Sequence, residues 1–320
     1  MNKTATKVLA LCAAAMMTLT ACTGNAPATE EEKPSDAAST ETKDEATDKK
    51  DEDKTADASA VTGKHEITDL VLPKLAQNEL TTFNILHSET NEDFEILFNL
   101  VEGLLEKDSL DKRHPCVATE WGTEDGGLNW TFKLRNDVKW VDMNGNVKAD
   151  CVADDFLTAL EWTLNFHKND SIGTSMPCQM IKGAQEYYDY TKGLSKEEAY
   201  ALTAGEGSKF REMVAVEAPD AYTLHYTCTA EKPYFDSLMS YTTGMPMSQA
   251  MIDELGGVDG VRAMNNENMW YNSCYTMTSY LQGNEKVLTK NPEYWDKDCF
   301  LFDTVTIRMV ESNDVAYQLY

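Results

Sequence analysis

Residues 99–165 read NLVEGLLEKDSLDKRHPCVATEWGTEDGGLNWTFKLRNDVKWVDMNGNVKADCVADDFLTALEWTLN, and this stretch decides the fold class. Apolar residues recur at helical spacing at its start, which predicts one helix over residues 92–105. Apolar and polar residues then alternate over 130–140, which predicts a hairpin or short meander that turns at 135–137. The helical period returns after Asp154, where carboxylates favour a helix start. The order helix, meander, helix indicates a mixed α/β scaffold.

The first 64 residues predict export and tethering rather than a folded domain. Two lysines precede an apolar run over residues 8–19 that is too short to span a bilayer well, so we expect residues 1–21 to be a signal peptide. The run ends in Leu-Thr-Ala-Cys, which resembles a bacterial lipobox and predicts lipidation of Cys22. An ordinary secretory peptide with a chance cysteine is the alternative. Residues 22–64 are polar and lack aromatic residues, which predicts a disordered acidic tether.

The charge balance excludes one class of partner. The chain has 54 acidic and 28 basic residues and a formal net charge of −26, and most of the excess lies after residue 64. Counterion release from a polyanion requires clusters of basic residues, so we expect no binding of nucleic acid. This charge is compatible with an exported protein that binds zwitterionic or cationic ligands.

Catalytic and metal-binding motifs are lacking in the sequence. The five histidines are isolated, and there is no HExxH, GxSxG, P-loop or GxGxxG motif, so we expect no enzyme, cofactor or metal. Abundant carboxylates leave a carboxylate-based hydrolase as a remote alternative, with Glu120, Glu124, Asp125, Asp154 and Asp155 as the candidate side chains. Disulfides and buried thiols both stay open for the six cysteines of the body, which are Cys116, Cys151, Cys178, Cys228, Cys274 and Cys299.

Further elements are predicted along the body from the same kinds of pattern. Ser195 and Glu198 have the spacing of a capping box. Helices are expected over 179–190 and from 233 to 238, a hairpin over 214–227, and strands over 270–280, 286–290 and 305–310. Four tryptophans lie inside the periodic patterns and are expected in the core: Trp121, Trp130, Trp140 and Trp162.

Several motifs in register resemble those of the family 5 bacterial extracellular solute-binding proteins. They are Glu102-Gly103-Leu104-Leu105 (EGL), Ala118-Thr119-Glu120-Trp121 (similar to LAESW), Leu128–Arg135 (similar to a TF-x-LR motif), Val152–Phe156 (similar to VTAxDF) and Asn291–Trp295 (NPxYW). Two positions depart from the pattern. Ser273-Cys274-Tyr275 stands where the family has GPY, and Val152 stands where it has a threonine, so we expect Asp150 to cap the following helix.

The resemblance implies a two-lobe, periplasmic-binding-protein-like fold of mixed α/β type. It places the main lobe in residues 65–98 and 185–299, an accessory α+β domain in 99–184, and the start of the second lobe in 300–320. Because family members are considerably longer, we expect most of the second lobe to be missing. We also expect the present chain to bind peptide poorly by itself.

The resemblance further implies a lipoprotein on the outer side of the cell membrane, acting as the monomeric receptor of an ABC importer. It would capture short peptides and deliver them to a permease and its ATPase. Receptors of the same fold for nickel, haem or oligosaccharide are the alternatives. By register with the family, the ligand cleft falls on Ser88, Glu89, Thr90 and Asn91, with Thr242, Thr243 and Tyr275 as further candidates. A solvated loop or, for Tyr275, a place in the core is the competing interpretation.

Overall fold

The computed structural model describes residues 68–75 and 79–318. The predicted signal peptide, the lipidation site at Cys22 and the acidic tether lie outside the described residues. Within the described part of the chain, no helix has both the length and the apolar character needed to cross a bilayer.

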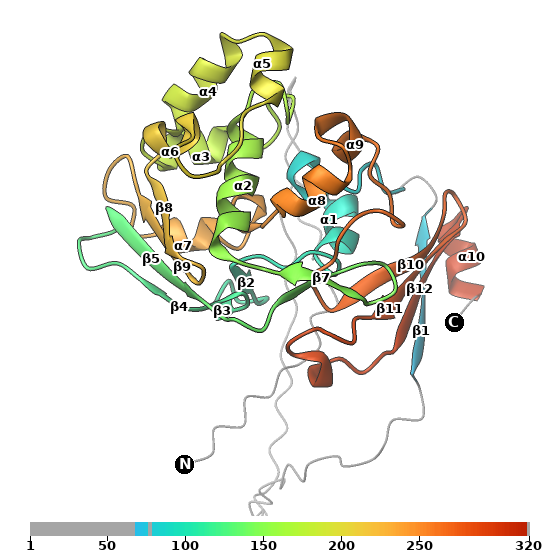
Figure 1. Ribbon diagram of the computed structural model, residues 1–320. Coiled ribbons are helices and arrows are strands. Elements are labelled where there is room, and N and C mark those ends of the chain that lie inside the picture. The colour runs from blue at the N-terminus through green and yellow to red at the C-terminus, as the bar shows by residue number, and fades with distance from the viewer. Residues whose placement is uncertain (1–67, 76–78, 319–320) are drawn as a thin grey trace, which may run out of the picture. The chain divides into compact units, whose positions relative to one another are not determined.

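One four-stranded sheet joins the two ends of the described chain. Its order is β1 (Asp69–Leu75), β12 (Thr304–Val310), β11 (Glu285–Lys290) and β10 (Tyr275–Leu281). β1 runs parallel to β12, and the other neighbours are antiparallel (Figure 1). The strands predicted over 270–310 are thereby confirmed, with β10 beginning only at Tyr275.

A second four-stranded sheet is antiparallel throughout. Its order is β4 (Ala118–Gly122), β5 (Asn129–Leu134), β9 (Thr223–Thr227) and β8 (Val216–Asp220). Side chains of β5 alternate between one buried face and one face open to solvent, as the pattern at Trp130, Phe132 and Leu134 predicts. β8 and β9 form the predicted hairpin.

Two short ribbons complete the β-structure, and they correct one prediction. β2 (Leu105–Lys107) pairs with β3 (Arg113–Pro115), and β6 (Lys139–Val141) pairs with β7 (Val147–Asp150). The hairpin predicted at 135–137 is therefore wrong, because β5 and β6 belong to different sheets. β5 has β4 on one side and β9 on the other, so no edge is left for β6.

Ten helices are present among the described residues, and α2 (Ala153–Leu164) is almost wholly buried. The others are α1 (Asn91–Leu97), α3 (Ser175–Met180), α4 (Ala184–Lys192), α5 (Lys196–Tyr200), α6 (Lys209–Met213), α7 (Phe235–Leu238), α8 (Gln249–Glu254), α9 (Val258–Arg262) and α10 (Asn313–Gln318). α2 contacts β8 of the second sheet and α4, and Figure 1 shows it near the middle of the view, with α3 and α4 on one side and α1 and α8 on the other. Three single turns of 3-10 helix are η1 (Ile85–His87), η2 (Thr242–Gly244) and η3 (Lys297–Cys299).

The first helix is much shorter than predicted. α1 ends at Leu97 and not at Leu105. Backbone groups after it bond to distant segments: the Leu104 N–H donates to the Gly244 carbonyl at 2.9 Å, and the Gly103 carbonyl accepts from the Val117 N–H at 3.2 Å. These long-range bonds replace the helical ones, so apolar spacing alone was misleading here.

The helix predicted over 179–190 is interrupted at Gly183. This residue has φ +84° and separates α3 from α4. A side chain there would place its Cβ 1.8 Å from the Met213 carbonyl oxygen, so only glycine fits.

Two helix caps can be compared with their predictions. Ser195 and Glu198 form the expected capping box at the start of α5. Asp150, expected to cap α2, instead forms an ion pair with Lys139. Asp155 supplies the bond at the start of α2 by accepting from the Val152 N–H at 3.0 Å. The residue that satisfies this helix start therefore lies inside the helix.

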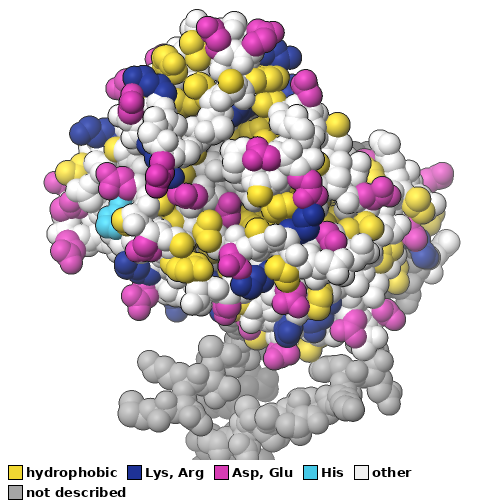
Figure 2. All heavy atoms as spheres, viewed as in Figure 1, with side chains coloured by type: hydrophobic (Ala, Val, Ile, Leu, Met, Phe, Trp, Pro, Cys, Tyr) yellow, Lys and Arg dark blue, Asp and Glu magenta, His cyan; other side chains and the backbone are white. Residues whose placement is uncertain are grey.

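The core contains most of the large aromatic residues. Trp130, Trp140 and Trp162 are buried as predicted, whereas Trp121 is only half-buried. Acidic side chains are spread over the visible face of the molecule with basic ones between them, and they do not gather in one patch (Figure 2).

The sheets cross the segment boundaries expected for the lobes. β9, which pairs with β8 inside the expected main lobe, also pairs with β5 of the expected accessory domain. β12, from the expected start of a second lobe, pairs with β1 and β11. The division into a main lobe, an accessory domain and a second lobe stays a prediction.

Candidate functional site

Residues 84–91, called the 84–91 segment below, contain all four residues predicted for the ligand cleft ahead of α1. Asn84 fixes the start of this segment, because its Oδ1 accepts a hydrogen bond from the Leu86 N–H at 3.0 Å. Both residues are buried. A short polar side chain of this kind satisfies a backbone group that no regular element reaches.

A buried carboxylate holds the other end of the segment. Asp93, in the first turn of α1, has 0% exposed surface. It accepts hydrogen bonds from the Ser88 hydroxyl at 2.8 Å, from the Thr81 N–H at 2.7 Å and from the Thr81 hydroxyl at 2.5 Å. A buried carboxylate is tolerated only when it is bonded in this way. Asp93 therefore fixes Ser88 relative to both Thr81 and α1.

The four predicted residues of the segment divide into two pairs. Ser88 is buried and donates to Asp93, and Thr90 caps α1 by accepting from the Asp93 N–H at 3.2 Å. Glu89 and Asn91 have exposed side chains. Two side chains thus support the segment while two point to solvent, and the ligand role of all four stays a prediction.

The structure brings one further pair of predicted residues close to the segment. Thr242 and Thr243 are half-buried and form most of η2, which lies in contact with η1. Both are therefore placed beside the 84–91 segment, although the two stretches are far apart in the sequence. Their ligand role stays a prediction.

Tyr275 lies beyond the other end of α1, and its side chain points inward. It is 5% exposed, its N–H donates to the Asn99 carbonyl at 3.0 Å, and its hydroxyl donates to the Phe302 carbonyl at 2.9 Å. Burial raises the pKa of Tyr275 to about 12, so the hydroxyl is a proton donor at neutral pH. The structure favours the core interpretation for this residue, and its ligand role also stays a prediction.

A second polar cluster was not predicted as a site. Glu102 of the EGL motif is buried and accepts a hydrogen bond from the Tyr294 hydroxyl at 2.6 Å and another from the Trp295 Nε1 at 2.7 Å. Burial raises the pKa of Glu102 to about 7, while the two donors act in the opposite direction. The EGL and NPxYW motifs therefore meet through one carboxyl group.

Gly103 of the EGL motif and Asn272 complete this cluster, which we call the Glu102 junction (Glu102, Gly103, Asn272, Tyr294 and Trp295). The Asn272 amide accepts from the Glu102 N–H at 2.8 Å and donates to the Glu102 carbonyl at 3.1 Å. A Cβ on Gly103 would lie 2.7 Å from the Gly244 carbonyl oxygen. The Arg135 guanidinium stacks 3.4 Å above the Trp295 ring. The motifs themselves were the signal for this cluster, but nothing in the sequence showed that they touch.

The groups that would favour other kinds of site are dispersed. Among residues 68–75 and 79–318, no group of three or more His, Cys, Asp or Glu side chains is arranged to hold a metal ion. The six cysteines named above are free thiols. Asp155 accepts from Trp140 at 2.9 Å inside the core, and Asp154 pairs with Arg211 at 2.6 Å on the surface.

An open hollow of about 640 Å³ lies over β4 and β5. Three of the carboxylates considered for a hydrolase, Glu120, Glu124 and Asp125, line it together with Lys133. None of the predicted ligand residues borders it. This hollow is a broad concavity on the solvent face of a sheet, without the enclosure that a small-molecule site usually has.

Comparison with known proteins gives a consistent result. The family model described as "Bacterial extracellular solute-binding proteins, family 5 Middle" matches residues 112–319. The chain is 26% identical over 235 residues to the oligopeptide-binding protein AmiA of Streptococcus pneumoniae, covering 73% of this chain and 32% of AmiA. It is 26% identical over 219 residues to the periplasmic oligopeptide-binding protein OppA of Escherichia coli, covering 67% of this chain and 34% of that protein.

Solved structures agree on the fold. OppA of Haemophilus influenzae, in complex with the peptide RPPGFSPFR, superposes with a TM-score of 0.63 at 25% identity, covering 80% of this chain and 45% of that one. An oligopeptide ABC transporter substrate-binding domain from Bacillus anthracis superposes with a TM-score of 0.63 at 26% identity, covering 78% and 43%. The chain thus spans about a third of the curated relatives' length and under half of these structures, and the predicted mixed α/β fold of this type is confirmed.

Proposed function

Because the chain belongs to the family 5 bacterial extracellular solute-binding proteins, a family of binding proteins rather than enzymes, we propose that it takes part in the capture of short peptides. The observation that carries the proposal is the 84–91 segment. Both ends of this segment are fixed by buried side chains, while Glu89 and Asn91 stay exposed beside η1. The bound peptide in the related structure from H. influenzae supports the same ligand class.

A peptide suits such a segment for physical reasons. Its backbone presents regular donors and acceptors, so a receptor with polar groups on a fixed loop gains affinity that is independent of the peptide side chains. Glu89 is an anionic group that would pair with a cationic group of the ligand, such as an α-amino group or a lysine. A fixed loop also reduces the entropy lost on binding.

The partners follow from the same proposal. The peptide would pass to a membrane permease driven by an ATPase, and lipid at Cys22 would keep the protein on the outer side of the cell membrane. In the family setting, closure of two lobes around the ligand would shift the population toward a closed form. The protein would act as a monomer, without a cofactor and without nucleic acid.

A thermal-shift screen tests the ligand class. The purified protein is mixed with tri- to hexapeptides, oligosaccharides, Ni²⁺ or haem, and the melting temperature is recorded for each. Ligands that bind only the native state raise it, so peptides are expected to raise it and the other three classes are not. A rise with oligosaccharide, Ni²⁺ or haem and none with any peptide would contradict the proposal.

A further inference from the structure

A strained turn follows α2, and the residue just before it, Asn169, is hydrogen-bonded to the 84–91 segment. Asp170 and Ser171 have φ of 50° and 66°, so two consecutive residues other than glycine adopt the left-handed conformation. Such strain persists only where the surroundings impose it, and it often marks functional sites. Arg262 holds the turn, because its Nη2 donates to the His167 carbonyl at 3.0 Å and to Asp170 Oδ1 at 2.8 Å.

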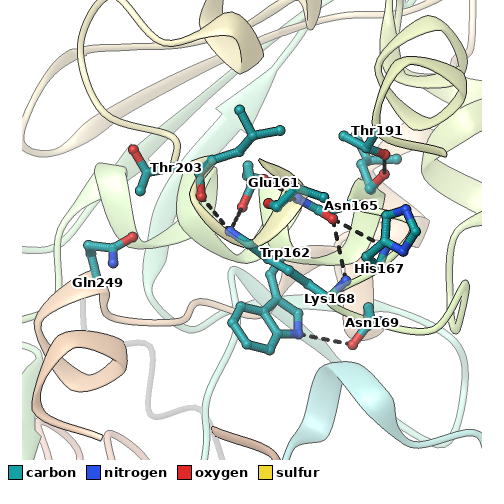
Figure 3. A network of polar contacts seen from close by, with 12 residues as sticks. Glu161, Trp162, Asn165, His167, Lys168, Asn169, Thr191, Thr203 and Gln249 are labelled. Atoms are coloured by element: carbon teal, nitrogen blue, oxygen red, sulfur yellow. Dashed lines mark hydrogen bonds and ion pairs between the residues drawn. The ribbon is translucent and has the colours of Figure 1, made fainter. Parts of the chain in front are cut away.

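The turn places one fully buried amide group against the segment. Asn169 is 0% exposed, and its Nδ2 donates to the Leu86 carbonyl at 2.8 Å and to the Ile172 carbonyl at 2.8 Å. Its Oδ1 accepts from the Trp162 Nε1 at 3.1 Å (Figure 3). Each polar atom of the amide has a partner, and one of those partners is the backbone of the 84–91 segment.

The support behind Asn169 is rigid and polar. Glu161 and Lys168 form a buried ion pair at 2.7 Å, and the Asn165 amide donates to Glu161 at 3.0 Å (Figure 3). Tyr187 adds a hydroxyl that donates to Glu161 at 2.8 Å. A buried pair of this kind is weak evidence of stability, since apolar residues of similar size often do as well. Its network does, however, fix the direction of the chain from α2 into the turn.

We propose that Asn169 is a positioning residue that fixes the Leu86 carbonyl and so holds the 84–91 segment in its ligand-binding conformation. This inference rests on the proposed function, because the segment is taken to contact the peptide. The segment is held at two points: Asn169 donates a hydrogen bond to the Leu86 carbonyl, and Asp93 accepts one from the Ser88 hydroxyl. Glu89 follows Ser88 directly, so the direction of its side chain depends on both hydrogen bonds.

Hydrogen exchange followed residue by residue tests the positioning role. The amides to follow are those of Leu86, His87 and Ser88, whose N–H groups bond to Asn84 and Ile85 inside the 84–91 segment. Asn169→Asp keeps the shape but loses the donor to Leu86 and Ile172, and Trp162→Phe removes the N–H that orients Asn169 together with part of a buried ring. Tyr187→Phe is the matched control, since it loses one buried bond of the same network without reaching the segment.

Asn169→Asp and Trp162→Phe are expected to speed exchange of these three amides about tenfold relative to Tyr187→Phe, because the segment then opens locally. Peptide affinity is expected to fall about tenfold in both variants, as the binding-competent fraction falls. The affinity probe is the peptide with the largest shift in the thermal screen. If Asn169→Asp does not fold, Trp162→Phe decides alone.

Two results would overturn the inference. Exchange of the three amides could match that of Tyr187→Phe, which would make Asn169 a merely structural residue. Exchange could instead rise while peptide affinity stays unchanged, which would separate the segment from binding. If the unaltered protein binds no peptide, the proposed function fails, whereas the exchange comparison still decides whether Asn169 orders the segment.

Discussion

The Glu102 junction and the 84–91 segment are both built around a buried carboxylate, yet they differ in what they leave exposed. At the junction, Glu102 accepts from Tyr294 and Trp295; Glu102 and Tyr294 are buried, and Trp295 is half-buried with the Arg135 guanidinium over its ring. Next to the 84–91 segment, Asp93 of α1 accepts from Thr81 and Ser88, while the side chains of Glu89 and Asn91 remain in solvent.

The residues that identify the family are therefore different from the residues that we propose to contact a ligand. The junction contains residues of two of the motifs that carry the resemblance, EGL and NPxYW, and it joins distant parts of the chain. The 84–91 segment contains no motif, and the exposed side chains of Glu89 and Asn91 form no hydrogen bond or ion pair with the other described residues. Changes at the junction should therefore alter stability, whereas changes at exposed positions of the segment should alter binding.

The largest expected effect is at Gly103. Gly103→Ala places a Cβ 2.7 Å from the Gly244 carbonyl oxygen and from the Met245 side chain, so the backbone must shift. We expect a loss of about 3 kcal/mol or more in the free energy of unfolding, measured by urea denaturation. Gly122→Ala is the control, because no atom lies within 4 Å of its added Cβ. Equal stability of the two variants would show that the junction is not tightly packed.

The second effect is a dependence on pH at Glu102. Burial raises the pKa of this carboxyl from 4.5 to about 7 in the folded state. The folded protein then binds the proton more tightly than the unfolded chain does, so stability falls as pH rises from 4.5 to 7 and is level above it. The loss amounts to about 3 kcal/mol for the unaltered protein. Glu102→Gln cannot ionise, and its stability should lack this component in urea titrations at each pH. Identical pH profiles would refute the assignment.

A smaller loss is expected when one donor is removed from the junction. Tyr294→Phe deletes the hydroxyl that donates to Glu102 at 2.6 Å and leaves the ring in place. A hydrogen bond to a charged group contributes about 1.5–3 kcal/mol, which sets the expected fall in the free energy of unfolding at pH 8. Tyr317→Phe, at a side chain 86% exposed, should show no change. A similar loss in both variants would contradict the role of the Glu102 bond.

The smallest effect is expected at Glu89 and only in binding. Glu89→Gln removes an exposed negative charge, so stability should stay within about 0.5 kcal/mol of the unaltered protein. Affinity for a lysine-containing peptide should fall up to about fivefold, the usual limit for an exposed ion pair. Glu206→Gln, at another exposed glutamate, should leave affinity unchanged. Equal losses in the two variants would point to an effect of net charge alone.

The features predicted correctly from the sequence are mostly local. The capping box of Ser195 and Glu198 closes within three residues, and the β8–β9 hairpin needs only its own turn. The helix predicted past Leu97 was wrong because Gly103 and Leu104 bond to segments far along the chain. The partners of β5 were missed for the same reason, since β9 lies far from it in sequence.

The candidate site was predictable only in outline. Register with the family indicated residues 88–91, but nothing there showed that Ser88 and Thr90 serve Asp93. Thr90 and Asp93 do have the spacing of a helix cap, and this was the one available signal. The bond between Asn169 and Leu86 had no signal at all, because it depends on how α2 packs in the folded chain.

Titration with a lysine-containing pentapeptide, followed by amide chemical shifts, shows which residues of the chain contact the peptide. It detects weak binding and reports each residue separately. Shifts should concentrate at residues 84–91 and 242–243, and the amide resonances of the Glu102 junction should not move. Shifts confined to the junction or to the hollow over β4 and β5, or no shifts at millimolar peptide, would contradict the proposed ligand contacts.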